Sequence, residues 1–157
     1  MGSGKSSLGK KLAATLRYDF ADTDQMIEMK LGKTISEIFS EQGEKKFRKL
    51  EQEALHDTTQ LHKMVIATGG GLPAFHNNMK TMNDAGVTLY LQCSIPFLTS
   101  RLKEKKADRP LLQNLQEDDL MINVTRLLEI RKPYYLEAKL IYDIPNTSVE
   151  TIIKSIL

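Results

Sequence analysis

Apolar residues along this chain form two kinds of pattern, which alternate from one stretch to the next. Some stretches are short continuous apolar runs, and in the others apolar residues recur every three or four positions. The run from Met64 to Thr68 has strand length and predicts a parallel strand that is covered on both faces. Further strands are predicted at residues 17–22, 87–92 and 139–143. Because helical spacing fills the stretches between these strands, the pattern predicts an α/β fold with a parallel sheet.

The helical stretches carry start and stop signals. The first begins directly after Ser7, where leucines recur every fourth residue. Thr34 and Glu37 have the T-x-x-E form of a capping box, and Gly43 predicts the end of the short helix that this box opens. The remaining helices are predicted at residues 25–31, 44–61, 74–86, 95–102, 117–131 with a kink or end at Pro133, and 149–156.

Length and composition indicate one ordinary globular domain. Of the 157 residues, 41% are hydrophobic and 27% charged, and a chain of this size can bury about 70% of its unfolded surface. The 22 basic and 20 acidic residues are well mixed, and a net charge of +2 creates no strong field for nucleic acid or a membrane surface. We therefore expect neither of these partners.

The lone cysteine, Cys93, ends an apolar run and is expected to be a buried structural thiol. One cysteine cannot form an internal disulfide, which fits a reducing compartment. No apolar segment approaches the roughly 18 residues of a membrane span, and the first residues do not have the pattern of a secretory leader. The expected location is the cytoplasm.

The opening residues have the pattern of a phosphate-binding loop. They read G-S-G-K-S, the second half of G-x-x-x-x-G-K-[ST], and a helix follows directly. Glycines let backbone N–H groups wrap phosphate oxygens, and the helix points its positive end at the anion. Lys5 would then reach the β- and γ-phosphates, and the Ser6 hydroxyl would bind Mg²⁺. The predicted nucleotide-binding residues are Gly2, Ser3, Gly4, Lys5, Ser6 and Ser7. A Gly/Ser-rich tail ahead of a helix is the alternative.

Only the second half of this motif is present. The first glycine of a complete loop, and the buried parallel strand that aims the loop, would both lie before Met1. We expect the natural chain to begin about ten residues earlier. The alternative is a fold that runs without its first strand.

Two carboxylates, Asp22 and Asp24, stand where the predicted strand at residues 17–22 ends. The carboxyl ends of strands in an α/β sheet are where metal and substrate contacts gather. Asp22 is predicted to hold Mg²⁺ through water, and Asp24 to accept a hydrogen bond from a substrate hydroxyl or to act as its base. Equally open is a capping role, in which Asp24 or Thr23 starts the next helix.

Three further stretches carry candidate chemistry. Gly69-Gly70-Gly71 lets the backbone come close to a ligand, with a flexible turn as the alternative. Arg48 and Glu51, three positions apart on a predicted helix, are typical of a solvated surface pair when taken alone. Residues 103 to about 116, which include Arg109, are charged and irregular, as in a mobile lid or an ordinary exposed loop.

Taken together, these motifs resemble the shikimate kinase family. The matching segments cover nearly the whole chain in the family's order: Gly2 to Ser6, Asp22 to Asp24, Phe47-Arg48, Gly69 to Gly71, Arg109 to Leu112 and Arg131 to Tyr134. The resemblance implies a three-layer parallel sheet of the P-loop kinase fold with strand order 2-3-1-4-5, its first strand absent here. It also implies one domain over residues 1–157, with substrate-binding helices at about 25–61 and a lid at about 103–116.

The activity implied by the resemblance is ATP-dependent phosphorylation of the 3-hydroxyl of shikimate, in aromatic amino acid biosynthesis, with Mg²⁺ as cofactor. By motif match Asp24 binds the ring hydroxyls and Arg48 and Arg131 clamp the carboxylate. The implied substrate contacts also include Gly69, Gly70 and Gly71. Guanidinium forks suit a planar carboxylate, which makes these roles physically reasonable.

The implied catalytic residues are Lys5, Asp24 and Arg109, the last of which sits on the lid and comes down on the transferring phosphate. Phosphoryl transfer depends mainly on charge placed around the transferring group, which two cations and a metal ion supply. A monomer that binds ATP and shikimate is expected. A gluconate-type small-molecule kinase is one alternative, against which Phe47-Arg48 and the glycine run argue. A non-catalytic remnant that has lost nucleotide binding is the other.

Overall fold

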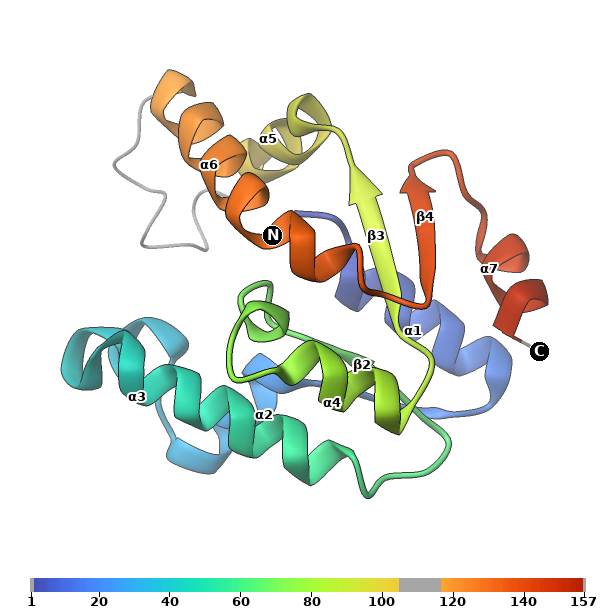
Figure 1. Ribbon diagram of the computed structural model, residues 1–157, viewed down its shortest axis with the longest axis horizontal. Coiled ribbons are helices and arrows are strands. Elements are labelled where there is room, and N and C mark those ends of the chain that lie inside the picture. The colour runs from blue at the N-terminus through green and yellow to red at the C-terminus, as the bar shows by residue number, and fades with distance from the viewer. Residues whose placement is uncertain (1, 105–116, 157) are drawn as a thin grey trace.

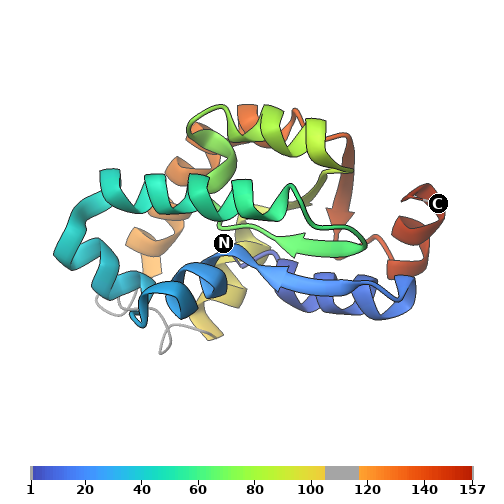
Figure 2. The same cartoon turned by 90° about the horizontal axis from the view of Figure 1, so that it is seen from below.

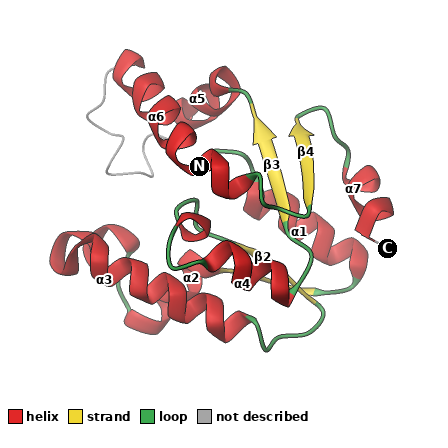
Figure 3. Cartoon of the chain, viewed as in Figure 1, coloured by secondary structure: helices red, strands yellow, loops and turns green. Residues whose placement is uncertain are grey.

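The computed structural model describes residues 2–104 and 117–156, in which helices and strands alternate (Figures 1 and 3). The strands are β1 (Asp19–Asp22), β2 (Met64–Ala67), β3 (Leu89–Cys93) and β4 (Leu140–Ile144). The helices are α1 (Lys5–Leu16), α2 (Thr23–Leu31), α3 (Ile35–Thr58), the short 3-10 helix η1 (Leu72–Ala74), α4 (Asn78–Ala85), α5 (Ile95–Glu104), α6 (Glu117–Tyr135) and α7 (Val149–Ile156). Among the described residues no helix is both long and apolar enough to cross a bilayer.

The strands pair in parallel, which confirms the predicted α/β fold. β1 lies beside β2, with Phe20 opposite Val65, and β3 lies beside β4, with Leu91 opposite Tyr142. Helix α1 packs against β1 and β2 from one side, while α4 lies on the other side of β2 (Figures 1 and 2). Parallel strands covered on both faces explain why β2 reads as a continuous apolar run.

A long apolar groove of about 550 Å³ separates the two strand pairs. Strands β2 and β3 form the two sides of the groove. Leucines of α1, such as Leu8 and Leu12, cover one face, and Met79 and Met82 of α4 cover the other. Within the described part of the chain, β2 pairs only with β1 and β3 only with β4. Protein interiors hold few voids larger than one water molecule, so a groove of this size is exceptional.

The groove coincides with the position of the first strand in the expected order 2-3-1-4-5. Since β1 to β4 correspond in chain order to the second to fifth strands, that order places the first strand between β2 and β3. The described strands therefore agree with the second to fifth positions of the expected order.

Two apolar clusters support the fold on either side of the groove. One holds Cys93 of β3 with residues of α5 and α6, and the other joins α2 to α3 through Ile27, Ile38 and Phe47. Cys93 is buried as predicted, and its burial raises the pKa of the thiol.

Several helix boundaries differ from the sequence-based predictions. Helix α2 begins at Thr23 and not at residue 25, because the Asp22 carboxylate caps it by accepting the Asp24 N–H at 3.1 Å. The Thr34 capping box is present as predicted, and Gly43, with φ 76° and ψ 170°, has non-helical backbone, so α3 consists of two helical parts that meet at the predicted break.

Three other boundaries also shift. Helix α3 ends at Thr58, so Leu61 lies beyond it, and α6 continues past Pro133 to Tyr135. The helix predicted at residues 74–86 begins only at Asn78, because the two residues before it have positive φ.

Candidate active site

The phosphate-loop residues lead into α1 through left-handed backbone. Gly2 and Gly4 have φ of 75° and 88°, conformations that are costly for any residue with a Cβ. Gly4 precedes the first turn of α1, where the N–H groups of a helix have no intrahelical partner. Such a helix start attracts anions, so the local geometry suits the predicted phosphate site.

Ser6 and Asp22, the predicted magnesium ligands, lie together. The Ser6 hydroxyl donates a hydrogen bond to Oδ2 of Asp22 at 2.7 Å, which joins the start of α1 to the end of β1. Hard oxygen atoms of this kind are what Mg²⁺ prefers, and the ion normally keeps several waters and phosphate oxygens as its other ligands. No group of three or more acidic, histidine or cysteine side chains that could hold a metal ion occurs in residues 2–104 and 117–156.

Arg101 of α5 lies against the loop and was not singled out from the sequence. A Cβ on Gly4 would stand 3.0 Å from Nη1 of Arg101, and the guanidinium carbon lies 5.5 Å from the centre of the Phe97 ring. Nothing in the sequence separates this arginine from the other basic residues around it. The contact adds a cation to the loop beside Lys5.

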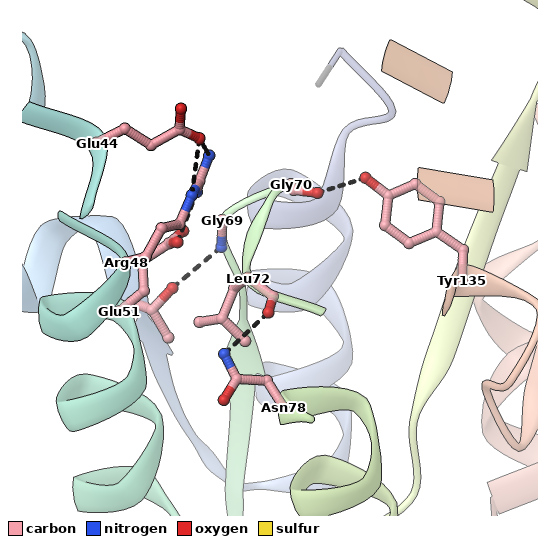
Figure 4. A network of polar contacts seen from close by, with 9 residues as sticks. Glu44, Arg48, Glu51, Gly69, Gly70, Leu72, Asn78 and Tyr135 are labelled. Carbon is pink, nitrogen blue, oxygen red and sulfur yellow. Dashed lines mark hydrogen bonds and ion pairs between the residues drawn. The ribbon is translucent and has the colours of Figure 1, made fainter. Parts of the chain in front are cut away.

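Arg48 and Glu51 form a buried ion pair, so the surface-pair interpretation of the sequence is wrong. Arg48 is 8% exposed and Glu51 only 1%. Nη1 of Arg48 donates to Oε2 of Glu51 at 2.6 Å, while Nη2 and Nε donate to Oε1 of Glu44 at 2.8 and 3.2 Å (Figure 4). Arg48 is thus held from both sides by carboxylates of its own helix.

Burial and charge act in opposite directions on this pair. Burial lowers the pKa of Arg48, but the hydrogen bonds to Glu51 and Glu44 outweigh it and raise that pKa above the ordinary value. Burial and the nearby Asp24 together raise the pKa of Glu51 above its ordinary value, although Arg48 and Arg131 lower it in part. Arg48 therefore remains a fixed positive charge, and Glu51 is the partner that accepts a proton more easily.

Three aromatic rings lie close to the Arg48 guanidinium. Its central carbon lies 4.2 Å from the centre of the Phe75 ring, 5.4 Å from that of Phe47 and 5.9 Å from that of Phe39. Cation–π contacts of this kind fix an arginine without occupying its N–H groups.

Two glycines of the run, Gly69 and Gly71, pass so close to these side chains that a Cβ would clash with them where they now lie. A Cβ on Gly71 would stand 2.4 Å from Nη1 of Arg48, and one on Gly69 would stand 2.7 Å from Oδ1 of Asp24 and 2.8 Å from Oε1 of Glu51. The run is therefore a site of close approach, as its three glycines predicted.

Hydrogen bonds fix the glycine run to two other elements. The Gly69 N–H donates to Oγ1 of Thr23 at 3.0 Å, so Thr23 supports the run instead of capping α2. The Tyr135 hydroxyl of α6 donates to the Gly70 carbonyl (Figure 4). These two hydrogen bonds hold the glycine run in place between α2, α3 and α6.

Arg131 of α6 faces the same region. Burial raises the pKa of Tyr135, and the nearby Arg131 lowers it in part; Arg131 also lowers the pKa of Glu51. The predicted substrate residues Asp24, Arg48, Arg131 and the glycine run are thus brought together from α2, α3, α6 and the end of β2. A carboxylate, two guanidinium groups and backbone polar groups around one space suit a small hydroxylated acid.

Some residues of the site fall outside the sequence-based prediction or outside the described chain. Arg109 and residues 105–116 of the lid predicted at about 103–116 lie outside the described residues. Glu44, Phe75 and Tyr135 were not singled out, although the spacing of Glu44 and Arg48 at i and i+4 is a signal for a contact.

Comparison with known proteins gives one consistent result. The family model described as shikimate kinase matches residues 1–157. The chain is 44% identical to a shikimate kinase of Bacteroides fragilis over 142 residues, covering 90% of this chain and 79% of that protein. It is 38% identical to a shikimate kinase of Azobacteroides pseudotrichonymphae over 158 residues, covering 100% of this chain and 93% of the relative.

Solved structures agree with the sequence matches. The crystal structure of a Bacteroides thetaiotaomicron shikimate kinase superposes with a TM-score of 0.91 at 38% identity, covering 99% of this chain and 90% of the other. A shikimate kinase from Acinetobacter baumannii, solved in complex with shikimate, superposes with a TM-score of 0.87 at 32% identity, covering 99% and 86%.

Proposed function

Since the chain belongs to the shikimate kinase family, whose members are ATP-dependent phosphotransferases, we propose how its own residues bind shikimate and transfer the phosphoryl group. The observation that carries the proposal is the buried guanidinium of Arg48, which lies against Gly71, while Asp24 lies against Gly69 of the same run. This arrangement offers a cation for a carboxylate and, two residues away along the run, an acceptor for a hydroxyl. A ring acid with hydroxyl groups matches both.

On the substrate side, Arg48 and Arg131 hold the carboxylate of shikimate and the glycine run lines the ring. Asp24 accepts a hydrogen bond from the 3-hydroxyl and takes its proton as the phosphoryl group arrives. Support for this role comes from the position of Asp24 at the start of α2, directly after β1 and one residue from the fixed Thr23–Gly69 contact.

On the nucleotide side, the loop from Gly2 to Ser7 holds the phosphates of ATP, and Lys5 reaches the β- and γ-phosphates. Ser6 and Asp22 hold Mg²⁺, which supplies neutralising charge at the phosphates. Arg109 would add a further cation from the lid. The loop geometry and the contact between Ser6 and Asp22 support this assignment.

We further propose a single domain over residues 1–157 that acts as a cytoplasmic monomer. The family model spans all of these residues, and the only cysteine is a buried thiol suited to a reducing compartment. Sedimentation equilibrium checks the monomer, since a dimer would double the measured mass.

The test of the substrate site is Arg48→Lys. Lysine keeps the charge but loses the planar fork, so we expect shikimate to bind about 10- to 100-fold more weakly, the value of one or two charge-assisted hydrogen bonds. Isothermal titration calorimetry with shikimate measures this directly and needs no nucleotide.

The matched control is Lys49→Ala, which removes an exposed positive charge from the next position of the same helix. It should leave the affinity for shikimate within about twofold of the unaltered chain, because an exposed charge is screened by solvent. If Arg48→Lys bound shikimate as tightly as the unaltered chain, or if Lys49→Ala lost as much affinity, the carboxylate site would be misplaced.

A further inference from the structure

We propose that the Glu44 carboxylate competes with the carboxylate of the substrate for Arg48. Glu44 binds Arg48 in the free protein and is displaced when shikimate binds. The inference rests on the proposed function of Arg48 and adds a residue that sets the affinity of the site. It follows from an asymmetry between the two carboxylates that hold the Arg48 guanidinium.

The first carboxylate, Glu51, is a permanent partner. Its side chain is 2% exposed and accepts from Nη1 of Arg48 at 2.6 Å. Buried among α3, Gly69 and Asp24, it has no access to solvent if the contact breaks. Separating this pair would leave a charge buried without a partner, which is strongly unfavourable.

The second carboxylate, Glu44, is an exchangeable partner. Its side chain is 58% exposed, and one oxygen, Oε1, accepts from both Nη2 and Nε of Arg48. Glu44 directly follows Gly43, the residue at which α3 departs from helical backbone. An exposed carboxylate at such a break can turn into solvent and be hydrated there, while Glu51 still pairs the buried Arg48.

Glu44 acts on the guanidinium edge that suits a bound carboxylate. The Nε and Nη2 hydrogens of arginine form a fork that matches a planar carboxylate. Figure 4 shows Glu44 and Glu51 on opposite sides of the Arg48 guanidinium. When Glu44 and Glu51 are both ionised, they and Arg48 carry a net charge of −1. This charge repels the carboxylate of an incoming substrate until Glu44 moves away from Arg48.

Arg48 itself need not move during this exchange. Its guanidinium is stacked 4.2 Å from the centre of the Phe75 ring and lies against Gly71, contacts that do not involve Glu44. Glu44 thus keeps the buried cation paired in the free protein, and the substrate carboxylate takes over the same N–H groups in the complex.

The test is Glu44→Gln, which removes the charge and keeps the size of the side chain. We expect the dissociation constant of shikimate, measured by isothermal titration calorimetry, to fall about twofold to fivefold, because the competing charge belongs to a side chain that is largely solvated. The methyl ester of shikimate, which has no charged carboxylate, should bind the variant and the unaltered chain equally. The control Glu53→Gln neutralises an exposed carboxylate elsewhere on α3 and should change neither affinity.

A second measurement follows the exchange directly. In a crystal structure with shikimate bound, the oxygens of Glu44 should lie more than about 4 Å from the Arg48 nitrogens, while Glu51 stays in contact. Unchanged or weaker binding of shikimate by Glu44→Gln, or a Glu44–Arg48 contact that persists in the complex, would overturn the proposal. If the unaltered chain binds no shikimate at all, the proposed function fails and this inference fails with it.

Discussion

Addition of one apolar β-strand and a glycine ahead of Met1 is expected to raise the melting temperature by about 8–16 °C and to tighten ATP binding at least about tenfold. The groove between β2 and β3 has apolar faces and two strand edges, so it suits a parallel strand of about five residues, the length of its neighbours. Burial of five apolar side chains stabilises the fold by about 1.5–3 kcal/mol each, and ordering the backbone of the strand costs about 1–2 kcal/mol per residue. The central values leave a net gain in the free energy of unfolding of about 4 kcal/mol, which corresponds to the expected rise in melting temperature. The gain in ATP affinity follows because a seated strand preorganises the loop at Gly2 and Gly4.

Differential scanning calorimetry and calorimetric titration with ATP measure the two effects. The matched control is an extension of equal length with proline at alternating positions, which cannot donate hydrogen bonds to either strand edge. This control should leave the melting temperature and the affinity for ATP close to those of the chain that begins at Met1. Equal gains from both extensions, or none from either, would show that the groove does not hold a strand.

Asp24→Asn is expected to lower kcat about 100-fold or more in the strand-bearing chain, while the dissociation constant of shikimate changes by less than about threefold. The amide keeps the size of the carboxylate and one acceptor oxygen but cannot take the hydroxyl proton. Because Oδ1 of Asp24 lies against the Cα of Gly69, a substitution of equal size avoids any clash with the glycine run.

A coupled assay of ADP release gives kcat, and calorimetry gives the affinity for shikimate. Asp84→Asn, which neutralises an exposed carboxylate of α4 paired with Lys80, is the control and should retain full activity. A kcat within tenfold of the unaltered chain would remove Asp24 from the proton transfer and leave it only a binding role.

The sequence was sufficient to predict the elements whose signals are local. The β2 run, the Asp22 and Asp24 carboxylates after β1, and the glycine run all depend on residues that are neighbours in the chain. The same holds for the Thr34 capping box, whose two members lie one helical turn apart. Such features survive folding because tertiary contacts reinforce them.

Burial of charged residues could not be predicted in the same way. Arg48 and Glu51 have the spacing of an ordinary exposed pair, and only the ring of Phe75 and the glycine run, which come from a later part of the chain, cover them. Tyr135 reaches Gly70 across 65 positions of sequence, which no local pattern records. Gly43 indicated a helix end, and its non-helical backbone does separate the two parts of α3.

The incomplete loop motif illustrates how sequence and structure complement each other. The sequence contains the second half of a phosphate-loop motif, and the structure adds an apolar groove between β2 and β3. The contact between the start of α1 and the end of β1 places Ser6 against Asp22.

The most direct test of the central claim is ADP release from Mg-ATP with shikimate or gluconate as acceptor, on the chain that begins at Met1 and on the strand-bearing chain. The account predicts release that depends on shikimate and not on gluconate, with the strand-bearing chain the more active. Absence of shikimate-dependent release from both chains, with both folded, would contradict the roles of Lys5 and Asp24 and favour a non-catalytic remnant. Release with gluconate alone would show that the substrate is wrong.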